Sequence, residues 1–162
     1  MLKKFFEKLK RLHALDSHAI ENIYNLKGRN GGKPLVICLG DVEHIYRDCH
    51  VNVPEELLRD LLPGPVTLVL QHSEGLNKDL NPFTSAAGVR IPNHTFIREV
   101  AQACSGPLAS TSTNISTRAS TLTVSEFQDL WPQLSLIIDG RVNMVFVKGN
   151  HGSPIYLNSL RG

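Results

Sequence analysis

The sequence predicts a single domain of the α/β class, and three observations lead to this prediction. The chain has 162 residues, of which 41% are hydrophobic and 20% charged, ordinary values for a globular domain with its own core. Short apolar runs typical of buried strands recur along it. Segments with apolar residues at helical spacing lie between these runs, and such an alternation is typical of α/β folds.

The order of these patterns predicts five helices and five strands. Asp16 is placed to cap the first helix, Pro54 falls in the first turn of the third, and Pro132 is expected to end the last. The segment 76–87 is predicted as a polar loop. The predicted helices are 16–26, 41–48, 53–62, 95–104 and 124–131, and the predicted strands are 35–39, 66–70, 88–92, 134–140 and 145–147.

Residues 1–13 form a basic amphipathic segment, which we separate from a main domain at 14–162. Its apolar residues recur at helical spacing, and five Lys or Arg residues occupy other positions. The segment either packs on the domain, contacts a membrane surface or a partner, or directs the chain to an organelle. Glu7 and the shortage of serine count against the last alternative.

The composition argues against several classes of protein. The formal net charge of +2 is too small to indicate nucleic-acid binding by itself, and no apolar run is long enough to predict a membrane span. The three cysteines are far apart, so we expect a reducing compartment: the cytoplasm, with the mitochondrion as the alternative. His44, Cys49 and His50 lack the spacing of metal ligands, so no protein-bound metal is predicted.

A glycine-rich segment between the first helix and the first strand carries three cations, Lys27, Arg29 and Lys33. Its three glycines allow the backbone to approach a ligand closely, and arginine and lysine are suited to phosphate oxygens. The segment is therefore a candidate anion site, although a solvated surface turn would have the same composition. No Gly-x-x-x-x-Gly-Lys-Ser/Thr motif is present, so it is not a Walker A loop.

Two later stretches carry polar groups beside apolar ones. Arg90 lies between apolar residues in the predicted strand 88–92, so it is either an edge charge or a cation aimed into a cleft. The segment 106–116 is rich in hydroxylic residues, which either surround a polar ligand or cap a helix. Neither a Gly-x-Ser-x-Gly nor a Gly-x-Gly-x-x-Gly motif occurs, which counts against a serine hydrolase and a dinucleotide fold.

Four motifs occur in a fixed order, and a short fifth one, Ile138-Asp139-Gly140, follows them. Together they resemble the YrdC family of threonylcarbamoyl-AMP synthases, especially its animal members, over about residues 15–140. Each motif alone is weakly specific, whereas the ordered set is specific. The four are Lys27-Gly28-Arg29 with Lys33-Pro34-Leu35, Leu62-Pro63-Gly64-Pro65-Val66-Thr67, Gly88-Val89-Arg90-Ile91-Pro92 and Thr111-Ser112-Thr113-Asn114-Ile115-Ser116.

The resemblance implies a twisted open mixed sheet with flanking helices and a basic concave face. It implies a nucleotidyltransferase that forms threonylcarbamoyl-AMP and pyrophosphate from ATP, L-threonine and bicarbonate, with Mg²⁺ accompanying the ATP substrate. The threonylcarbamoyl group would then pass to adenosine next to the anticodon of tRNA through a separate transferase complex, so tRNA or double-stranded RNA is an expected partner. Such chemistry needs cations at developing charge more than it needs a nucleophilic side chain.

The resemblance also assigns residues to the two substrates. For the nucleotide it assigns Lys27, Arg29, Lys33 and Asn114. For threonine it assigns Arg90, Ser112 and Ser153, with Arg90 on the carboxylate. No residue is expected to act as a nucleophile.

The sequence also departs from the family pattern at both ends. The family's first strand carries a Pro-Thr-Asp-Thr-x-Tyr-Gly motif, and residues 1–13 stand in its place. A late family segment is matched only by Gly152-Ser153, and the family's Arg-Pro-Gly end has no counterpart. The alternative function is therefore a non-catalytic module that binds RNA or a nucleotide through the same face.

Overall fold

The computed structural model describes residues 16–27, 34–104, 106–111, 124–134, 136–139, 145–148 and 155–157. Helices, 3₁₀ helices (η) and strands alternate along this part of the chain. In order they are α2 (Ser17–Lys27), β1 (Val36–Cys38), η2 (Val42–His44), α3 (Ile45–Asp48), β2 (Cys49–His50), α4 (Glu55–Leu61), β3 (Leu68–His72), η3 (Lys78–Leu80), β4 (Ala86–Arg90), α5 (Thr95–Ala103), β5 (Leu108–Ser110), η4 (Val124–Gln133), β6 (Leu136–Asp139), β7 (Val145–Lys148) and β8 (Ile155–Leu157).

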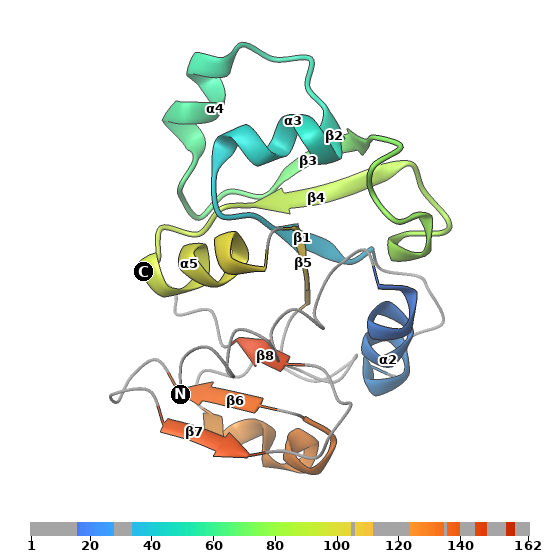
Figure 1. The fold of residues 1–162 in the computed structure, drawn as a ribbon, viewed down its shortest axis with the longest axis vertical. Helices are drawn as coiled ribbons and strands as arrows, with labels where there is room; N and C mark the ends of the chain where they lie inside the picture. Colours follow the sequence, from blue (N-terminus) through green and yellow to red (C-terminus); the bar gives the residue numbers. More distant parts are fainter. Residues whose placement is uncertain are drawn as a thin grey trace.

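The strands form two sheets. The larger has the order β2-β3-β4-β1-β5, with β1 and β4 parallel and the other pairs antiparallel. The smaller has the order β7-β6-β8. Figure 1 shows the larger sheet in the middle, α3 and α4 above it, α5 and α2 on either side below it, and the smaller sheet with η4 at the bottom. The predicted open mixed sheet with flanking helices is confirmed.

One face of the larger sheet carries the main hydrophobic core. Leu68, Val89, Ile37 and Ala109 are paired in register across four neighbouring strands, so their side chains point to the same face. All four belong to or pack against the same buried cluster, which Ile20 of α2 joins. Because side chains alternate between the two faces of a strand, the pairing of the strands decides which positions are buried, since the apolar residues of β1 and β3 are consecutive.

The opposite face is covered in part by α5. Ile97 and Val100 of this helix are buried against Cys38 of β1 and Leu108 of β5. The spacing of three residues between the two helix positions gives α5 one apolar face, which is why the sequence predicted this helix well. Helix α5 thus packs on the part of this face that β1 and β5 form.

The two predicted strands 66–70 and 88–92 are displaced by two residues from β3 and β4. The displacements have opposite directions, because β3 starts later and β4 starts earlier than predicted. The strands are antiparallel, with Leu68 opposite Val89 and Gln71 opposite Ala86. Their pairing therefore sets both boundaries together, and an apolar run in one strand alone does not contain that information.

The prediction that 76–87 is a polar loop is wrong in part. The segment contains η3, and Leu76 and Leu80 are 2% and 1% exposed. Asn77 stabilises the start of η3, because its Oδ1 accepts a hydrogen bond of 2.8 Å from the backbone N–H of Asp79. The last residues of the segment, from Ala86, belong to β4.

The last predicted helix also differs in kind. Instead of an α-helix that stops near Pro132, the chain forms the 3₁₀ segment η4 with a kink at Phe127, and Pro132 lies inside it. A proline in a helix interior removes a backbone hydrogen bond and clashes with the preceding turn, which counts against a regular α-helix through this position. The strands β2 and β8, of two and three residues, are too short to show a period in the sequence.

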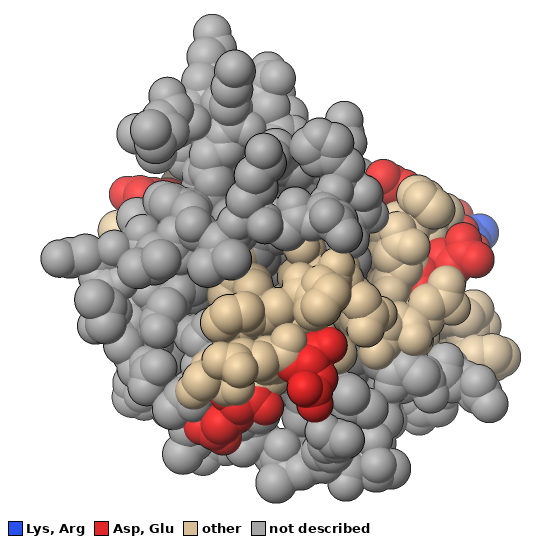
Figure 2. All heavy atoms as spheres, turned by 90° about the horizontal axis from the view of Figure 1, so that it is seen from below, with Lys and Arg blue, Asp and Glu red and all other residues tan. Residues whose placement is uncertain are grey.

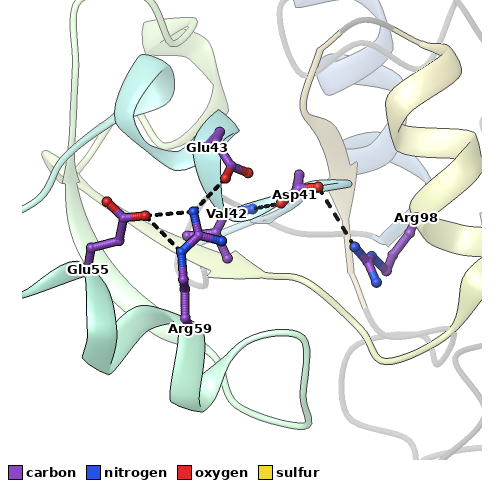
Figure 3. Close-up of polar contacts among 6 residues, drawn as sticks. All are labelled: Asp41, Val42, Glu43, Glu55, Arg59 and Arg98. Atoms are coloured by element: carbon purple, nitrogen blue, oxygen red, sulfur yellow. Dashed lines mark hydrogen bonds and ion pairs between the residues drawn. The ribbon is translucent and has the colours of Figure 1, made fainter.

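Ion pairs connect the surface elements beside β1. Figure 3 shows Arg59 of α4 between Glu43 and Glu55, with its Nε 2.7 Å from Oε1 of Glu55 and its Nη2 2.6 Å from Oε1 of Glu43. In the same view Arg98 of α5 points toward Asp41, at 3.9 Å. No described helix is long and apolar enough to cross a membrane.

Acidification is expected to weaken the Glu43 contacts. Interaction with Asp41, and then with Arg59, lowers the pKa of Glu43 from 4.5 to about 2. A lowered carboxyl pKa stabilises the folded state above pH 4.5, and this contribution is lost as the pH falls toward 2. Urea midpoints measured over this interval should fall less in Glu43→Gln than in the wild type, and high salt should reduce the difference. Parallel pH curves for the two proteins would contradict the assignment.

Candidate functional site

The face of the larger sheet opposite the core is partly open. In β3, Val69 is 72% exposed and Gln71 is exposed as well. Val69 is opposite Gly88 of β4, which is in turn opposite Val36 of β1, so all three point to this face. Val36 is opposite Ser110 of β5, and Gly88, Val36 and Ser110 are all partly exposed. We call this surface the open sheet face.

The centre of the open sheet face is built from small side chains. A Cβ at Gly88 would lie 3.0 Å from Cγ2 of Val36 and 3.3 Å from Cγ2 of Thr67. Ala86 lies two residues before Gly88 on the same face, and Ser110 lies across β1 from it. Glycine at this position therefore leaves room for the side chains of Val36 and Thr67, which approach the backbone of β4 closely.

Arg90 lies at the end of β4, beside the part of this face that α5 covers. Its backbone carbonyl accepts a hydrogen bond of 2.9 Å from the N–H of Leu39, and the residue is opposite Cys38 in β1. Its Nε is buried and has no hydrogen-bond partner among the residues that the structure describes. Buried guanidinium N–H groups are nearly always paired, so Arg90 is suited to an anionic ligand. Of the two sequence interpretations, the edge charge does not fit, because β4 is an inner strand of the sheet and the Nε of Arg90 is buried.

His94 is a second candidate, which sequence reasoning did not single out. It lies four residues after Arg90, at the N-terminal cap of α5, and its Nδ1 is buried without a hydrogen-bond partner in the described part of the chain. A histidine that directly precedes a predicted helix, just after Pro92, is the signal that could have identified it.

Most of the other predicted site residues cannot be placed on the sheet. Lys27 is the last residue of α2, and only its backbone is described. The remaining predicted positions lie outside the described residues: Arg29, Lys33, Ser112, Asn114 and Ser153. The predicted segment 1–13 lies outside them as well. Their assignments stay predictions.

The described residues that flank two of the predicted segments are neighbours. Val36, which follows the cationic segment by three residues, is opposite Ser110, which precedes Ser112 by two. The first residue of β1 and the last residue of β5 therefore lie side by side, at the same end of these two strands. Arg90 is two strand positions away, at the level of Cys38, which is about 7 Å along the strands. One ligand on the open sheet face can span that separation.

The electrostatic environment of Cys38 reflects this arrangement. Burial raises the pKa of its thiol from 9.0 to about 11, and the positive charge of Arg90 opposes this increase. A thiol pKa that is higher in the folded protein stabilises the fold below pH 9, and this stabilisation is lost as the pH rises toward 11. Two pKa units correspond to about 3 kcal/mol at most.

We expect the free energy of unfolding of the wild type to decrease between pH 9 and 11. Cys38→Ala should show a weaker decrease, because alanine has no thiol whose deprotonation at high pH favours the unfolded state. Denaturant unfolding at several alkaline pH values measures the difference. Cys49, whose pKa burial also raises to about 11, gives the matched comparison in Cys49→Ala. An unchanged pH dependence in Cys38→Ala would contradict the prediction.

The predicted basic concave face stays a prediction, because the side chains that would make it basic are not described. Figure 2 shows acidic side chains on the described part of one face of the molecule, with hardly any basic ones. The predicted basic concave face depends on Lys27, Arg29 and Lys33, whose side chains are not among those described. Within the described residues, no group of three or more His, Cys, Asp or Glu side chains is arranged to hold a metal ion.

Proteins of similar sequence bear one name. The threonylcarbamoyl-AMP synthase of Homo sapiens is 63% identical over 124 residues, which are 76% of this chain and 44% of that protein. The protein of the same name from Mus musculus is 61% identical over 127 residues, which are 78% of this chain and 45% of that protein. The chain therefore spans less than half the length of these curated relatives.

Solved structures of similar fold contain relevant ligands. The P. abyssi Sua5 protein in complex with L-threonine has a TM-score of 0.66 and 30% identity, over 72% of this chain and 35% of that one. Full-length HypF in a phosphate- and nucleotide-bound form has a TM-score of 0.62 and 26% identity, over 72% and 18% of the two chains. The sequence model of the Sua5/YciO/YrdC family, described as "Telomere recombination", matches residues 12–148 of this chain. Since that match covers most of the sequence, the chain belongs to the Sua5/YciO/YrdC family.

Proposed function

We propose that this chain carries L-threonylcarbamoyladenylate synthase activity. The observation that supports it most is Arg90, a partly buried cation whose Nε is buried without a partner among the described residues, in a chain 63% identical to a threonylcarbamoyl-AMP synthase. In the proposed reaction the threonine nitrogen bonds to the carbon of bicarbonate and water leaves. An oxygen of the resulting carbamate then bonds to the α-phosphorus of ATP, and pyrophosphate leaves.

The residues have distinct roles in this proposal. The guanidinium of Arg90 binds the threonine carboxylate through charge-assisted hydrogen bonds, and Ser112 and Ser153 contact the same substrate. The nucleotide is bound by Lys27, Arg29, Lys33 and Asn114. Mg²⁺ enters with ATP and neutralises phosphate charge. No side chain forms a covalent bond to the substrates, because positioned cations stabilise the charge that develops on the phosphates.

The proposal also includes a second enzyme that uses threonylcarbamoyl-AMP as its substrate. Threonylcarbamoyl-AMP is a reactive mixed anhydride, so a separate transferase that delivers the threonylcarbamoyl group to tRNA is the expected partner, in the cytoplasm. The family's threonine-bound Sua5 structure supports threonine as the substrate. The role in tRNA modification is what the family resemblance of the sequence motifs implies, whereas the names of the relatives give the synthase activity alone.

Threonine-dependent turnover tests the proposal directly. The purified chain, supplied with ATP, L-threonine, bicarbonate and Mg²⁺, should release pyrophosphate and form threonylcarbamoyl-AMP. Omission of threonine should abolish both signals, and serine at the same concentration should restore little of them. If ATP binds but no product forms under any of these conditions, the chain is a nucleotide-binding module and the proposed activity is wrong.

A further inference from the structure

The second sequence motif, residues 62–67, ends in Thr67, to which the proposed reaction assigns no role. The motif lies between α4 and β3, and its backbone is joined to the chain just after β4, because the N–H of Gly64 donates to the carbonyl of Ile91 at 2.9 Å. The start of β3 is therefore held next to the end of the neighbouring strand β4, where Arg90 lies.

Thr67 lies beside Arg90. Leu68 is opposite Val89 in the antiparallel pair of β3 and β4, so the residue before Leu68 is a neighbour of the residue after Val89. Cγ2 of Thr67 would lie 3.3 Å from a Cβ at Gly88, which places the Thr67 side chain on the open sheet face. Arg90 follows Gly88 by two residues, and side chains two positions apart in a strand point to the same face. Thr67 and Arg90 therefore share this face on neighbouring segments.

Both side chains have hydrogen-bond capacity that the described residues leave unused. Thr67 is exposed, and within the described ranges no residue accepts a hydrogen bond from its hydroxyl. The Nε of Arg90 is buried and has no partner in the same ranges. A carboxylate has two oxygens, so it can accept from a guanidinium and from a hydroxyl at the same time. Opposite residues of antiparallel strands have Cβ atoms about 5 Å apart, a separation over which one carboxylate can contact both side chains.

We propose that Thr67 is a second substrate-binding residue for the threonine carboxylate. Arg90 donates to one carboxylate oxygen, and the Thr67 hydroxyl donates to the other. This inference rests on the proposed function, because it takes Arg90 to bind threonine. Two donors from neighbouring segments fix the orientation of the carboxylate as well as its position, so the α-amino nitrogen of threonine is presented in one direction to the carbon of bicarbonate.

Two substitutions of Thr67 separate its hydroxyl from the packing of its side chain. Thr67→Val keeps the methyl group that faces Gly88 and removes the hydroxyl, whereas Thr67→Ser keeps the hydroxyl and removes a methyl group. Thr95→Val is the matched control, because Thr95 is an exposed threonine at the start of α5, outside the sheet.

The value of kcat/KM for threonine is the first measurement, from pyrophosphate release at varied threonine. Thr67→Val should lower it about tenfold, which corresponds to about 1.4 kcal/mol, because a hydrogen bond to a charged group is lost. The KM for ATP should change less than about twofold. Thr67→Ser should stay within about threefold of the wild type, and Thr95→Val within about twofold. The inference is wrong if Thr67→Val keeps the wild-type value, or if Thr67→Ser loses as much as Thr67→Val.

The Arg90→Gln background tests whether both residues bind the same carboxylate. Contributions of two residues that share one ligand group are not additive. In this background Thr67→Val should cost less than about threefold, because the carboxylate is no longer held beside the hydroxyl. An undiminished tenfold loss would overturn the inference, since the hydroxyl would then act on another group.

Calorimetric titration of L-threonine, without turnover, separates this inference from the proposed function. If the wild type binds threonine but forms no product, the proposed activity fails, and weaker binding by Thr67→Val still supports the inference. If the wild type turns over and Thr67→Val has the same threonine affinity, only the inference fails. A wild type that binds no threonine overturns both.

Discussion

Replacement of Arg90 by glutamine is expected to lower threonine-dependent turnover roughly 100-fold at limiting threonine, because about two charge-assisted hydrogen bonds worth about 1.5 kcal/mol each are lost. The guanidinium Nε is buried in a position where the described residues give it no partner, and in the proposed function the threonine carboxylate is its partner. The loss should be mainly in kcat/KM for threonine, with the KM for ATP changed much less. Steady-state pyrophosphate release at varied threonine and varied ATP measures both.

Arg59→Gln is the matched control for that experiment. Arg59, unlike Arg90, has ion-pair partners among the described residues, Glu43 of η2 and Glu55 of α4, and both lie on the surface. Its replacement should leave turnover within about twofold of the wild type, since exposed ion pairs contribute little. Turnover of Arg90→Gln that equals that of Arg59→Gln would show that threonine does not bind Arg90.

Substitution of Gly40 by alanine is expected to destabilise the fold by about 1 to 3 kcal/mol, as overpacked sites usually do. A Cβ at this position would lie 2.5 Å from Cγ of Gln102 and 2.9 Å from the backbone carbonyl oxygen of Arg98. Arg98 Nε also donates to the carbonyl of Gly40 at 3.1 Å, so α5 cannot move away without loss of that bond. Thermal unfolding should show a decrease of about 2 to 4 °C per kcal/mol.

A double variant separates the two clashes at Gly40. Gln102→Ala removes the flexible side chain, whereas the contact with the Arg98 carbonyl belongs to the backbone of α5 and remains. Gly40→Ala should therefore still lower the melting temperature in the Gln102→Ala background, by a smaller amount. If Gly40→Ala melts at the same temperature as the wild type, α5 packs more loosely on the loop after β1 than the structure indicates.

The residues near Arg90 show how far sequence reasoning reached. The flanking apolar residues identified Arg90 as a candidate cation, but they left open whether it was an edge charge. The inner position of β4 in the sheet and the burial of the Nε of Arg90 decided the question. Five of the predicted ligand residues lie outside the described chain, so for them the sequence remains the source of the assignment.

The loop before β4 shows the opposite case. The sequence of 76–87 is polar and contains Asn and Pro, which predicts a turn wherever it occurs. Asn81 is nevertheless buried, because its amide pairs with Leu35, a residue 46 positions earlier. Local composition does not indicate a hydrogen-bond partner so far away in the sequence, and so the burial of Asn81 was not predicted.

The sequence by itself determined the α/β class, the family, the apolar segments that became β1 and α5, and the order of the motifs. These depend on periodicity and local residue chemistry, which are written in short stretches of chain. Only the tertiary structure decided the boundaries of β3 and β4, the open sheet face, and the long-range hydrogen bonds of Tyr24 and Asn81. Those features are pairings between distant segments, and a hydrogen bond that closes across the fold has no period or motif from which it can be read.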